Sequence, residues 1–140
     1  MTRLVRPAHA VTTEYLIGLH HCDLLGVAWH GRYFEWLEQA RAALFASVDL
    51  DVPQIRAMGH RLYVVDAQCR YMAPLSYGDT ARITAWFVEV QPLIRVAYDV
   101  RNAATGRWSA RAKTVLAATA ADGTLLVATP AVMLARLPAR

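Results

Sequence analysis

The spacing of apolar residues changes along the chain from a helical period to a strand period. Residues 31–47 contain many good helix formers, no proline, and one glycine at their start. Their aromatic and aliphatic positions cover more than half of a helix circumference, at Tyr33, Phe34, Trp36, Leu37, Ala40, Leu44 and Phe45. A helix that is apolar so widely is typically enclosed by other elements. We therefore predict a long, buried helix over residues 31–47.

The segments around this helix alternate between apolar and polar residues, which predicts strands. Residues 11–21 form a predicted first strand, residues 22–30 connect it to the helix, and residues 53–58 form a short second helix. Pro74, the Gly78–Asp79 pair and Pro92 then separate long strands. These strands are predicted at residues 63–73, 79–90, 94–102 and 107–119, with a short one at 125–128.

A C-terminal helix is predicted after the last strand, with Thr129 as its N-cap and Pro130 at its first position. The order is then one strand, an enclosed helix, and a meander of antiparallel strands. The simplest packing of these elements is an α+β fold with one antiparallel sheet wrapped around the long central helix. The length of 140 residues predicts a single domain over residues 1–140.

Composition changes this picture in one respect. Hydrophobic residues make up 56% of the chain and charged residues 19%, which excludes intrinsic disorder. So high an apolar fraction predicts that some surface is buried between subunits, as in a homodimer or a dimer of dimers.

Several protein classes are not expected from the sequence. No apolar run reaches the roughly 18 residues of a membrane span, and no apolar segment follows the basic residues near the start as it would in a secretory signal. Cys22 and Cys69 lie far apart without the spacing of metal ligands. We therefore expect free thiols, a cytoplasmic protein, no metal site and no cofactor.

The net charge of +4 has an uneven predicted distribution. On the sheet face away from the helix, strand alternation places Arg70, Arg82, Arg95, Arg101, Arg107, Arg111 and Lys113, opposed by Asp66 and Asp99. A solvated outer face is the common interpretation of such a pattern. The functional interpretation is attraction of phosphates or of an acidic carrier protein. No recognised motif supports a nucleic-acid partner.

Candidate chemistry lies in the segment that joins the first strand to the helix. The first amides of a helix have no intrahelical acceptor, so those near His30 and Gly31 could stabilise a developing oxyanion. Asp23, seven residues before His30, could place a carboxylate near them to activate water or to attack directly. A single aspartate in a loop is also commonly a turn or cap residue, so both interpretations stay open.

This segment carries a longer pattern, D-x-x-G-V-x-W-H-x-x-Y-x-x-x-x-E-x-A-R, starting at Asp23. The pattern and the later residues 71–79 resemble the acyl-CoA thioesterases of the 4-hydroxybenzoyl-CoA type, and the Tol-Pal-associated bacterial members look closest. The resemblance implies the hotdog fold and a dimer whose sheets join edge to edge, with sites at the interface. It also implies hydrolysis of an acyl or aroyl thioester of CoA or of an acyl carrier protein. Asp23 would be the nucleophile or general base, and the amide of His30 would polarise the thioester carbonyl.

Four further residues are candidate substrate contacts, namely Gly26, Gly31, Arg32 and Tyr33. Tyr33 is expected in the core or the pocket wall rather than as a proton donor. The His30 side chain is expected either to touch substrate, which makes it a second catalytic candidate, or to cap the helix.

The helix also carries acidic residues. The spacing of Glu38 and Arg41 predicts a mutual ion pair. Some other hotdog thioesterases use a helix glutamate for catalysis, which leaves Glu35 and Glu38 as alternatives to Asp23.

One departure from the family concerns the carrier of the acyl group. The turn at residues 90–94 has no charge before Arg95, whereas 4-hydroxybenzoyl-CoA thioesterases tend to place basic residues there for the CoA phosphates. This difference favours a carrier protein. Two alternatives remain. One is a hotdog dehydratase, but residues 30–32 are unlike the His-Phe-Pro-like segment expected at the helix start of such an enzyme. The other is a non-catalytic module that binds acyl thioesters.

Overall fold

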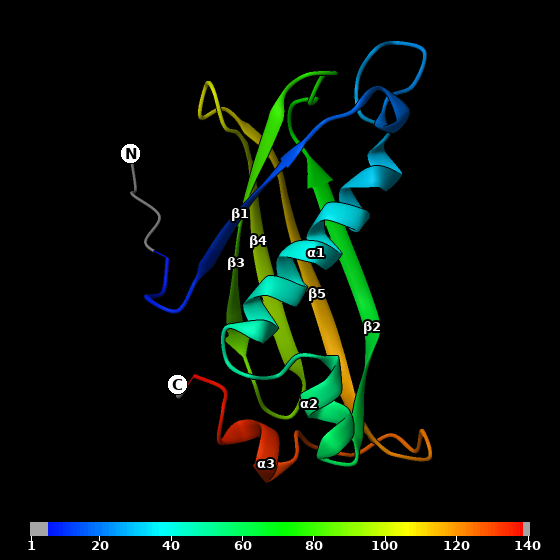
Figure 1. Ribbon diagram of the computed structural model, residues 1–140, viewed down its shortest axis with the longest axis vertical. Coiled ribbons are helices and arrows are strands. Elements are labelled where there is room, and N and C mark those ends of the chain that lie inside the picture. The colour runs from blue at the N-terminus through cyan, green and yellow to red at the C-terminus, as the bar shows by residue number, and fades with distance from the viewer. Residues whose placement is uncertain (1–5, 139–140) are drawn as a thin grey trace.

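The computed structural model describes residues 6–138, so the first five and last two residues of the predicted domain lie outside the description. One antiparallel sheet of five strands, in the order β1-β3-β4-β5-β2, curls around the helix α1 (Tyr33–Ala46). Figure 1 shows α1 crossing the concave face of the sheet. The predicted α+β architecture is confirmed.

The element bounds follow the predicted ones within a few residues. The strands are β1 (Val11–Leu16), β2 (His60–Tyr71), β3 (Thr80–Glu89), β4 (Ile94–Asn102) and β5 (Trp108–Ala120). The remaining helices are the 3-10 turns η1 (Leu19–His21) and η2 (His30–Arg32) and the short α2 (Val52–Ala57) and α3 (Ala131–Leu134).

The core lies between α1 and the concave face of the sheet. Leu44 on α1 is fully buried, as are Ile83 on β3 and Val96 on β4. Each of these strands turns every second residue toward the helix, because successive side chains of a strand point to opposite faces. The predicted alternation therefore explains which strand residues form the core.

Three local predictions were wrong. The first strand ends at Leu16 instead of continuing to residue 21, because the chain turns into η1. Residues 125–128 form no strand and contribute one bridge, between Thr119 and Leu125. Thr129 is not the N-cap of α3: its hydroxyl donates to the carbonyl of Val90, and Pro130 occupies the cap position.

The edge strand β2 has no neighbour on its outer side within the described residues. It is 12 residues long and exposes apolar side chains, with Val65 52% and Tyr63 47% exposed. A long apolar edge strand is a template for pairing with another chain.

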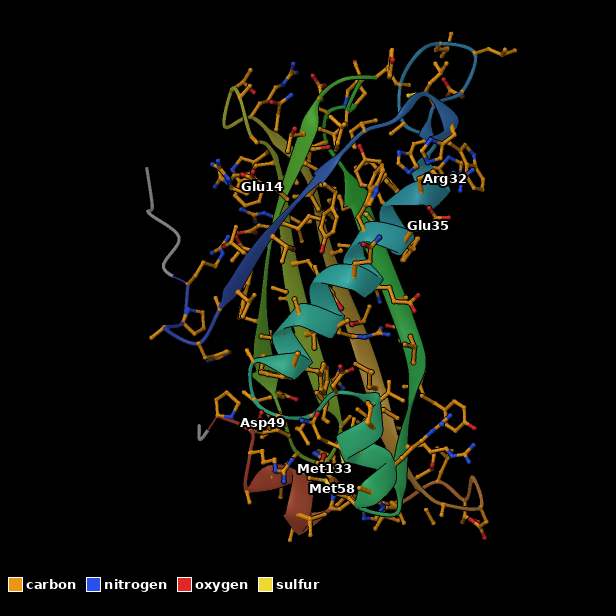
Figure 2. All side chains as sticks on the ribbon, viewed as in Figure 1. Glu14, Arg32, Glu35, Asp49, Met58 and Met133 are labelled. Carbon is orange, nitrogen blue, oxygen red and sulfur yellow. The ribbon has the colours of Figure 1, made fainter. Side chains whose placement is uncertain are left out.

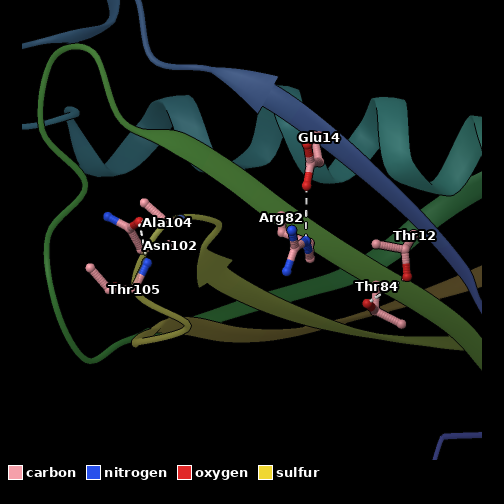
Figure 3. A network of polar contacts seen from close by, with 7 residues as sticks. All are labelled: Thr12, Glu14, Arg82, Thr84, Asn102, Ala104 and Thr105. Atoms are coloured by element: carbon pink, nitrogen blue, oxygen red, sulfur yellow. Dashed lines mark hydrogen bonds and ion pairs between the residues drawn. The ribbon is translucent and has the colours of Figure 1, made fainter.

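The convex face of the sheet carries the basic residues that alternation predicted, together with two acids that it missed. Glu14 forms an ion pair with Arg82 at 2.9 Å, and Glu89 pairs with Arg95 at 3.0 Å. Figure 3 shows the first of these pairs between β1 and β3. Among the described residues, no helix is long and apolar enough to cross a membrane.

Candidate active site

Asp23 lies at the tip of a small hairpin that leads into α1. The amide of Trp29 donates to the carbonyl of His21 at 2.9 Å, and the amide of Asp23 donates to Val27 at 3.0 Å. The turn is closed by the Gly26 amide, which donates to the Asp23 carbonyl at 3.1 Å. Aspartate at the first position and glycine at the fourth are the preferred residues of such a turn, and Gly26 has φ +77°, which glycine adopts without strain. The candidate Gly26 therefore has a backbone role.

The Asp23 carboxylate is exposed and partly engaged. Its Oδ1 accepts a 2.8 Å hydrogen bond from the amide of Leu25. Aspartate and asparagine both form this type of turn. Asp23 is therefore a turn residue, which is one of the two interpretations that the sequence left open. Its Oδ2 accepts no hydrogen bond within the described residues. One oxygen is held and the other is available for chemistry.

Two other segments hold this hairpin in place. The amide of Ala28 donates to Leu75 at 2.7 Å, and the amide of Tyr77 donates to Gly26 at 3.2 Å. On the other side, Arg32 donates to the carbonyl of His20 in η1 at 3.3 Å. The hairpin and the first turn of α1 therefore form one connected unit, at the upper end of α1 in Figure 1.

The first turn of the helix leaves amides free, as predicted. Within η2 the Arg32 amide donates to Trp29 at 2.9 Å and the Tyr33 amide donates to His30. In the described part of the chain, the amides of His30 and Gly31 donate to no backbone carbonyl. Free amides at a helix start attract negative charge.

Tyr71, at the end of β2, contacts this turn directly. Its hydroxyl donates to the carbonyl of His30 at 2.7 Å. Burial raises the pKa of Tyr71, so the hydroxyl is a protonated donor at neutral pH. The His30 carbonyl belongs to the same peptide unit as the Gly31 amide, and a donor on the carbonyl polarises that amide. In the sequence Tyr71 stood out only as part of residues 71–79, because a contact between β2 and the helix start is long-range.

Tyr33 lies in the core. It is 2% exposed, and its hydroxyl shares a 3.0 Å hydrogen bond with the Ser109 hydroxyl. Ser109 in turn donates to the carbonyl of Ala73 at 2.8 Å. The Tyr33 ring also meets the Tyr71 ring edge-on, with centroids 4.9 Å apart. Tyr33 thus anchors α1 to β5 and supports Tyr71.

Gly31 is packed closely against Trp29. A Cβ at this position would lie 2.3 Å from the ring of Trp29, which folds back over the glycine. The 51% exposed Trp29 ring therefore borders the free amides. The sequence contained both residues but could not show that one covers the other.

Arg32 and Glu35 lie together at the exposed start of α1, as Figure 2 shows, and form an ion pair at 2.8 Å. The His30 ring is exposed and packs 5.0 Å from the Trp29 ring and 6.1 Å from the Tyr71 ring, measured between centroids. The residue at the cap position of η2 is Trp29, so His30 is not its N-cap.

Two adjoining pockets lie along α1 beside β2, and we refer to them together as the groove. The first part, of about 340 Å³, is lined by Phe34, Leu37, Glu38, Arg41, Val64, Ala67, Tyr98 and Thr114. The second part, of about 310 Å³, extends past Phe45 and Ile55. The first part has both polar and apolar walls, and the second is mostly apolar, which suits an acyl chain or an aromatic ring.

The predicted ion pair between Glu38 and Arg41 is not formed. Neither residue is in an ion pair within the described range, and both line the groove. Arg41 instead lies by the Tyr98 hydroxyl, which shares a 2.7 Å hydrogen bond with Thr114. The helical spacing allowed the pair, but the buried hydroxyls draw the guanidinium inward.

The remaining candidate groups are thiols and imidazoles. Cys22 and Cys69 are free and half-buried, and burial raises the pKa of the Cys69 thiol. His21 accepts a 2.8 Å hydrogen bond from the Gly18 amide, and burial is the main cause of its lowered pKa. Among residues 6–138 there is no cluster of three or more His, Cys, Asp or Glu that could hold a metal ion.

Solved structures share this arrangement of a sheet around one helix. A hypothetical protein from Aquifex aeolicus superposes with a TM-score of 0.81 at 23% identity, over 91% of this chain and 99% of that one. A 1,4-dihydroxy-2-naphthoyl-CoA thioesterase from Synechocystis superposes with a TM-score of 0.77 at 20% identity, over 91% and 95% of the two chains. The fold is therefore the hotdog fold seen in thioesterases, as predicted.

Sequence comparison places the chain in a family. Residues 25–106 match the model of the thioesterase superfamily, and the chain belongs to this superfamily. A Synechocystis protein provisionally named an esterase is 39% identical over 72 residues, which are 51% of this chain and 43% of that protein. A Bacillus subtilis protein provisionally named an acyl-CoA thioesterase is 30% identical over 78 residues, 56% of each chain. The chain spans about half the length of the curated relatives it matches. The family match begins two residues after Asp23.

Proposed function

We propose that this protein hydrolyses an acyl or aroyl thioester of CoA or of an acyl carrier protein to a free acid and a thiol. The observation that carries the proposal is that hydrogen bonds join the Asp23 hairpin to the start of α1, where the amides of His30 and Gly31 are free. Membership of the thioesterase superfamily supports the reaction class.

Asp23 acts as general base or nucleophile in this proposal. As a base, its carboxylate takes a proton from water, and the hydroxide adds to the thioester carbonyl. The free amides of His30 and Gly31 donate to the oxyanion that forms. Collapse of the tetrahedral intermediate breaks the carbon–sulfur bond, and the departing thiolate takes the proton from Asp23.

The acyl group extends from the helix start into the groove between α1 and β2. Phe34 at the mouth of the groove and Leu37 deeper inside give it an apolar wall. Tyr33, behind this wall, supports the pocket without donating a proton, because its hydroxyl is engaged with Ser109. In this proposal Arg32 contacts the carrier from the exposed helix start, where it also pairs with Glu35. Glu35 and Glu38 take no part in the proposed chemistry.

We propose a homodimer, or a dimer of dimers, formed along the edge strand β2. The exposed Tyr63 and Val65 on that edge support pairing with a second copy. Leu24 and Leu25 beside Asp23 are more than 80% exposed, which supports a partner covering the site as well. Light scattering at micromolar concentration tests this assembly, and a fully active monomer would contradict it.

A cytoplasmic location is part of the same proposal, and the free thiols Cys22 and Cys69 support a reducing environment. The reaction is tested by thiol release from aliphatic and aromatic acyl groups, each attached to CoA and to a carrier protein. Turnover of at least one thioester supports hydrolysis. Saturable binding of thioesters without thiol release would identify a binding module, and hydration of an enoyl thioester instead would identify a dehydratase.

A further inference from the structure

The convex face of the sheet contains a group of neighbouring basic residues without acidic partners. We define this basic face as Arg70 on β2, Arg101 on β4, Arg107 in the following turn, and Arg111 and Lys113 on β5. Within the described residues, none of the five has a carboxylate at ion-pair distance. By contrast, Arg6, Arg82 and Arg95 elsewhere on the same side are each paired with an acid. The unpaired charge is therefore concentrated on β2, β5 and the end of β4.

The convex side carries an excess of positive charge. It holds nine of the 15 basic residues: Arg6, Arg61, Arg82, Arg95 and the basic face. It holds four of the 11 acidic residues: Glu14, Asp66, Glu89 and Asp99. The resulting excess of five positive charges is larger than the net charge of +4 of the whole chain.

This arrangement works against the stability of the sheet. Arg70 and Arg111 are directly opposite one another in the pairing of β2 with β5. Like charges at directly opposite positions of a sheet are destabilising. On its other side Arg111 is directly opposite Asp99 of β4, but Asp99 is in an ion pair with Arg6. A surface that is only solvated does not require the like-charge pair of Arg70 and Arg111.

Trp108 holds two of the arginines in fixed orientations. The guanidinium carbons of Arg101 and Arg111 lie 3.8 and 4.3 Å from the centroid of its ring. Arg101 donates one of its N–H groups to the carbonyl of Gly106 at 3.1 Å. The other N–H groups at the edge of a stacked guanidinium stay available, and it loses little entropy when it binds a carboxylate. Proteins that bind single-stranded nucleic acid without sequence preference stack the bases on aromatic rings. The Trp108 ring is already covered by the two arginines, so it is poorly placed for such stacking.

The basic face reaches the end of the molecule that carries the candidate active site. Arg70 directly precedes Tyr71, whose hydroxyl contacts the start of α1. Arg107 and Trp108 line a cleft of about 270 Å³ together with Ser76. Ser76 pairs with Val27 of the Asp23 hairpin. A thioester arm that starts at the basic face thus has a route toward Asp23 around the end of the sheet.

We infer that the basic face is a docking surface for an acidic protein, namely the carrier protein that delivers the thioester. Charge complementarity carries this choice of partner. A second copy of the chain is disfavoured as occupant, since two such faces would repel one another. The inference rests on the proposed thioester hydrolysis and specifies its carrier.

The variant Arg70→Glu tests the inference, with Arg136→Glu as the control. Arg136 undergoes the same change of charge on the exposed end of α3, where it donates to the carbonyl of Asp49. One acyl group is presented on an acyl carrier protein, on CoA, and on pantetheine alone. We expect kcat/KM for the carrier-protein thioester to fall roughly tenfold in Arg70→Glu, and the value for the pantetheine thioester to stay within about twofold. Arg136→Glu should change neither.

A second readout separates docking from a folding effect. The carboxylate that Arg70→Glu introduces would face Arg111 as an opposite charge, so the melting temperature of this variant should equal or exceed that of the parent. Parent kcat/KM for the carrier-protein thioester should also fall when NaCl rises from about 50 to 500 mM, because the attraction is screened.

Other results would overturn the inference. The first is an equal kcat/KM for the carrier-protein thioester in the parent and in Arg70→Glu. The second is a loss of kcat/KM in Arg70→Glu that is as large for the CoA thioester as for the carrier-protein thioester, which would assign the face to nucleotide phosphates. A smaller assembly in Arg70→Glu by light scattering would place Arg70 in the contact between copies along β2 and overturn its role in docking. Competition by single-stranded RNA at the same concentration as the carrier would assign the face to nucleic acid. If the parent hydrolyses no thioester, the proposed function fails, and calorimetric titration of parent and Arg70→Glu with the acyl carrier protein decides docking separately.

Discussion

Removal of the Tyr71 hydroxyl should slow turnover while leaving substrate binding nearly unchanged. In Tyr71→Phe the ring remains against Tyr33, and the change removes the 2.7 Å hydrogen bond to the His30 carbonyl. A neutral hydrogen bond contributes about 0.5–1.5 kcal/mol net. If the bond acts on the Gly31 amide mainly in the transition state, that energy corresponds to roughly a two- to tenfold lower kcat. Tyr71 is 42% exposed, so water can replace part of the bond, and the lower half of this range is expected.

The assay is steady-state thiol release, from which kcat and KM are obtained separately for the parent and the variant. Tyr63→Phe, on the same strand and 47% exposed, is the matched control and should show parental kcat. Replacing Tyr71 with fluorinated tyrosines of decreasing hydroxyl pKa should raise kcat step by step, as long as the hydroxyl stays protonated, because each is a stronger donor. A changed KM with parental kcat in Tyr71→Phe would refute the reasoning and assign Tyr71 to substrate binding.

Three further predictions concern Gly31, Tyr33 and His9. Gly31→Ala should lower kcat roughly tenfold, because its Cβ would displace the Trp29 ring and misplace the free amides, and the Trp29→Ala/Gly31→Ala double variant should recover most of the loss in the same assay. Tyr33→Phe should lower the free energy of unfolding by about 1 kcal/mol in urea titrations and keep kcat within about twofold, because the Tyr33 hydroxyl is bonded inside the core. His9 accepts the Phe87 amide and has a pKa lowered by burial, so its neutral form is stabilising above about pH 6.5, and this stability is lost as the pH falls through the lowered pKa. The melting temperature of His9→Gln should therefore depend less on pH between about 7.5 and 5 than that of the parent, and parallel curves would contradict this.

The fold could be predicted because its signals are local. The apolar circumference of residues 31–47 and the strict alternation in the later strands are each contained in a short window of sequence. The errors arose where distant residues compete for a local group. Thr129 has the sequence context of an N-cap, but its hydroxyl bonds to Val90, about forty residues earlier in the chain.

The candidate site was only partly predictable for the same reason. Asp23 and the free helix amides could be located from the turn sequence and from helix geometry. The contact between Tyr71 and His30 joins residues 41 positions apart, and the packing of Trp29 over Gly31 depends on a side-chain orientation. Alternation predicted which basic residues share a face of the sheet. It could not predict which of them lack an acidic partner, because that depends on the register between strands such as β2 and β5.

The most direct test of the central claim is the turnover of Asp23→Asn. Asparagine can form the same turn through its side-chain oxygen, so the hairpin should fold as in the parent. Asp122→Asn is a matched control, because Asp122 accepts the Thr124 amide at 2.9 Å in an equivalent exposed turn. We expect thiol release by Asp23→Asn to fall about 10²- to 10⁴-fold, His30→Ala to lose less, and Asp122→Asn to keep parental activity. Turnover by Asp23→Asn within about threefold of the parent would contradict the account.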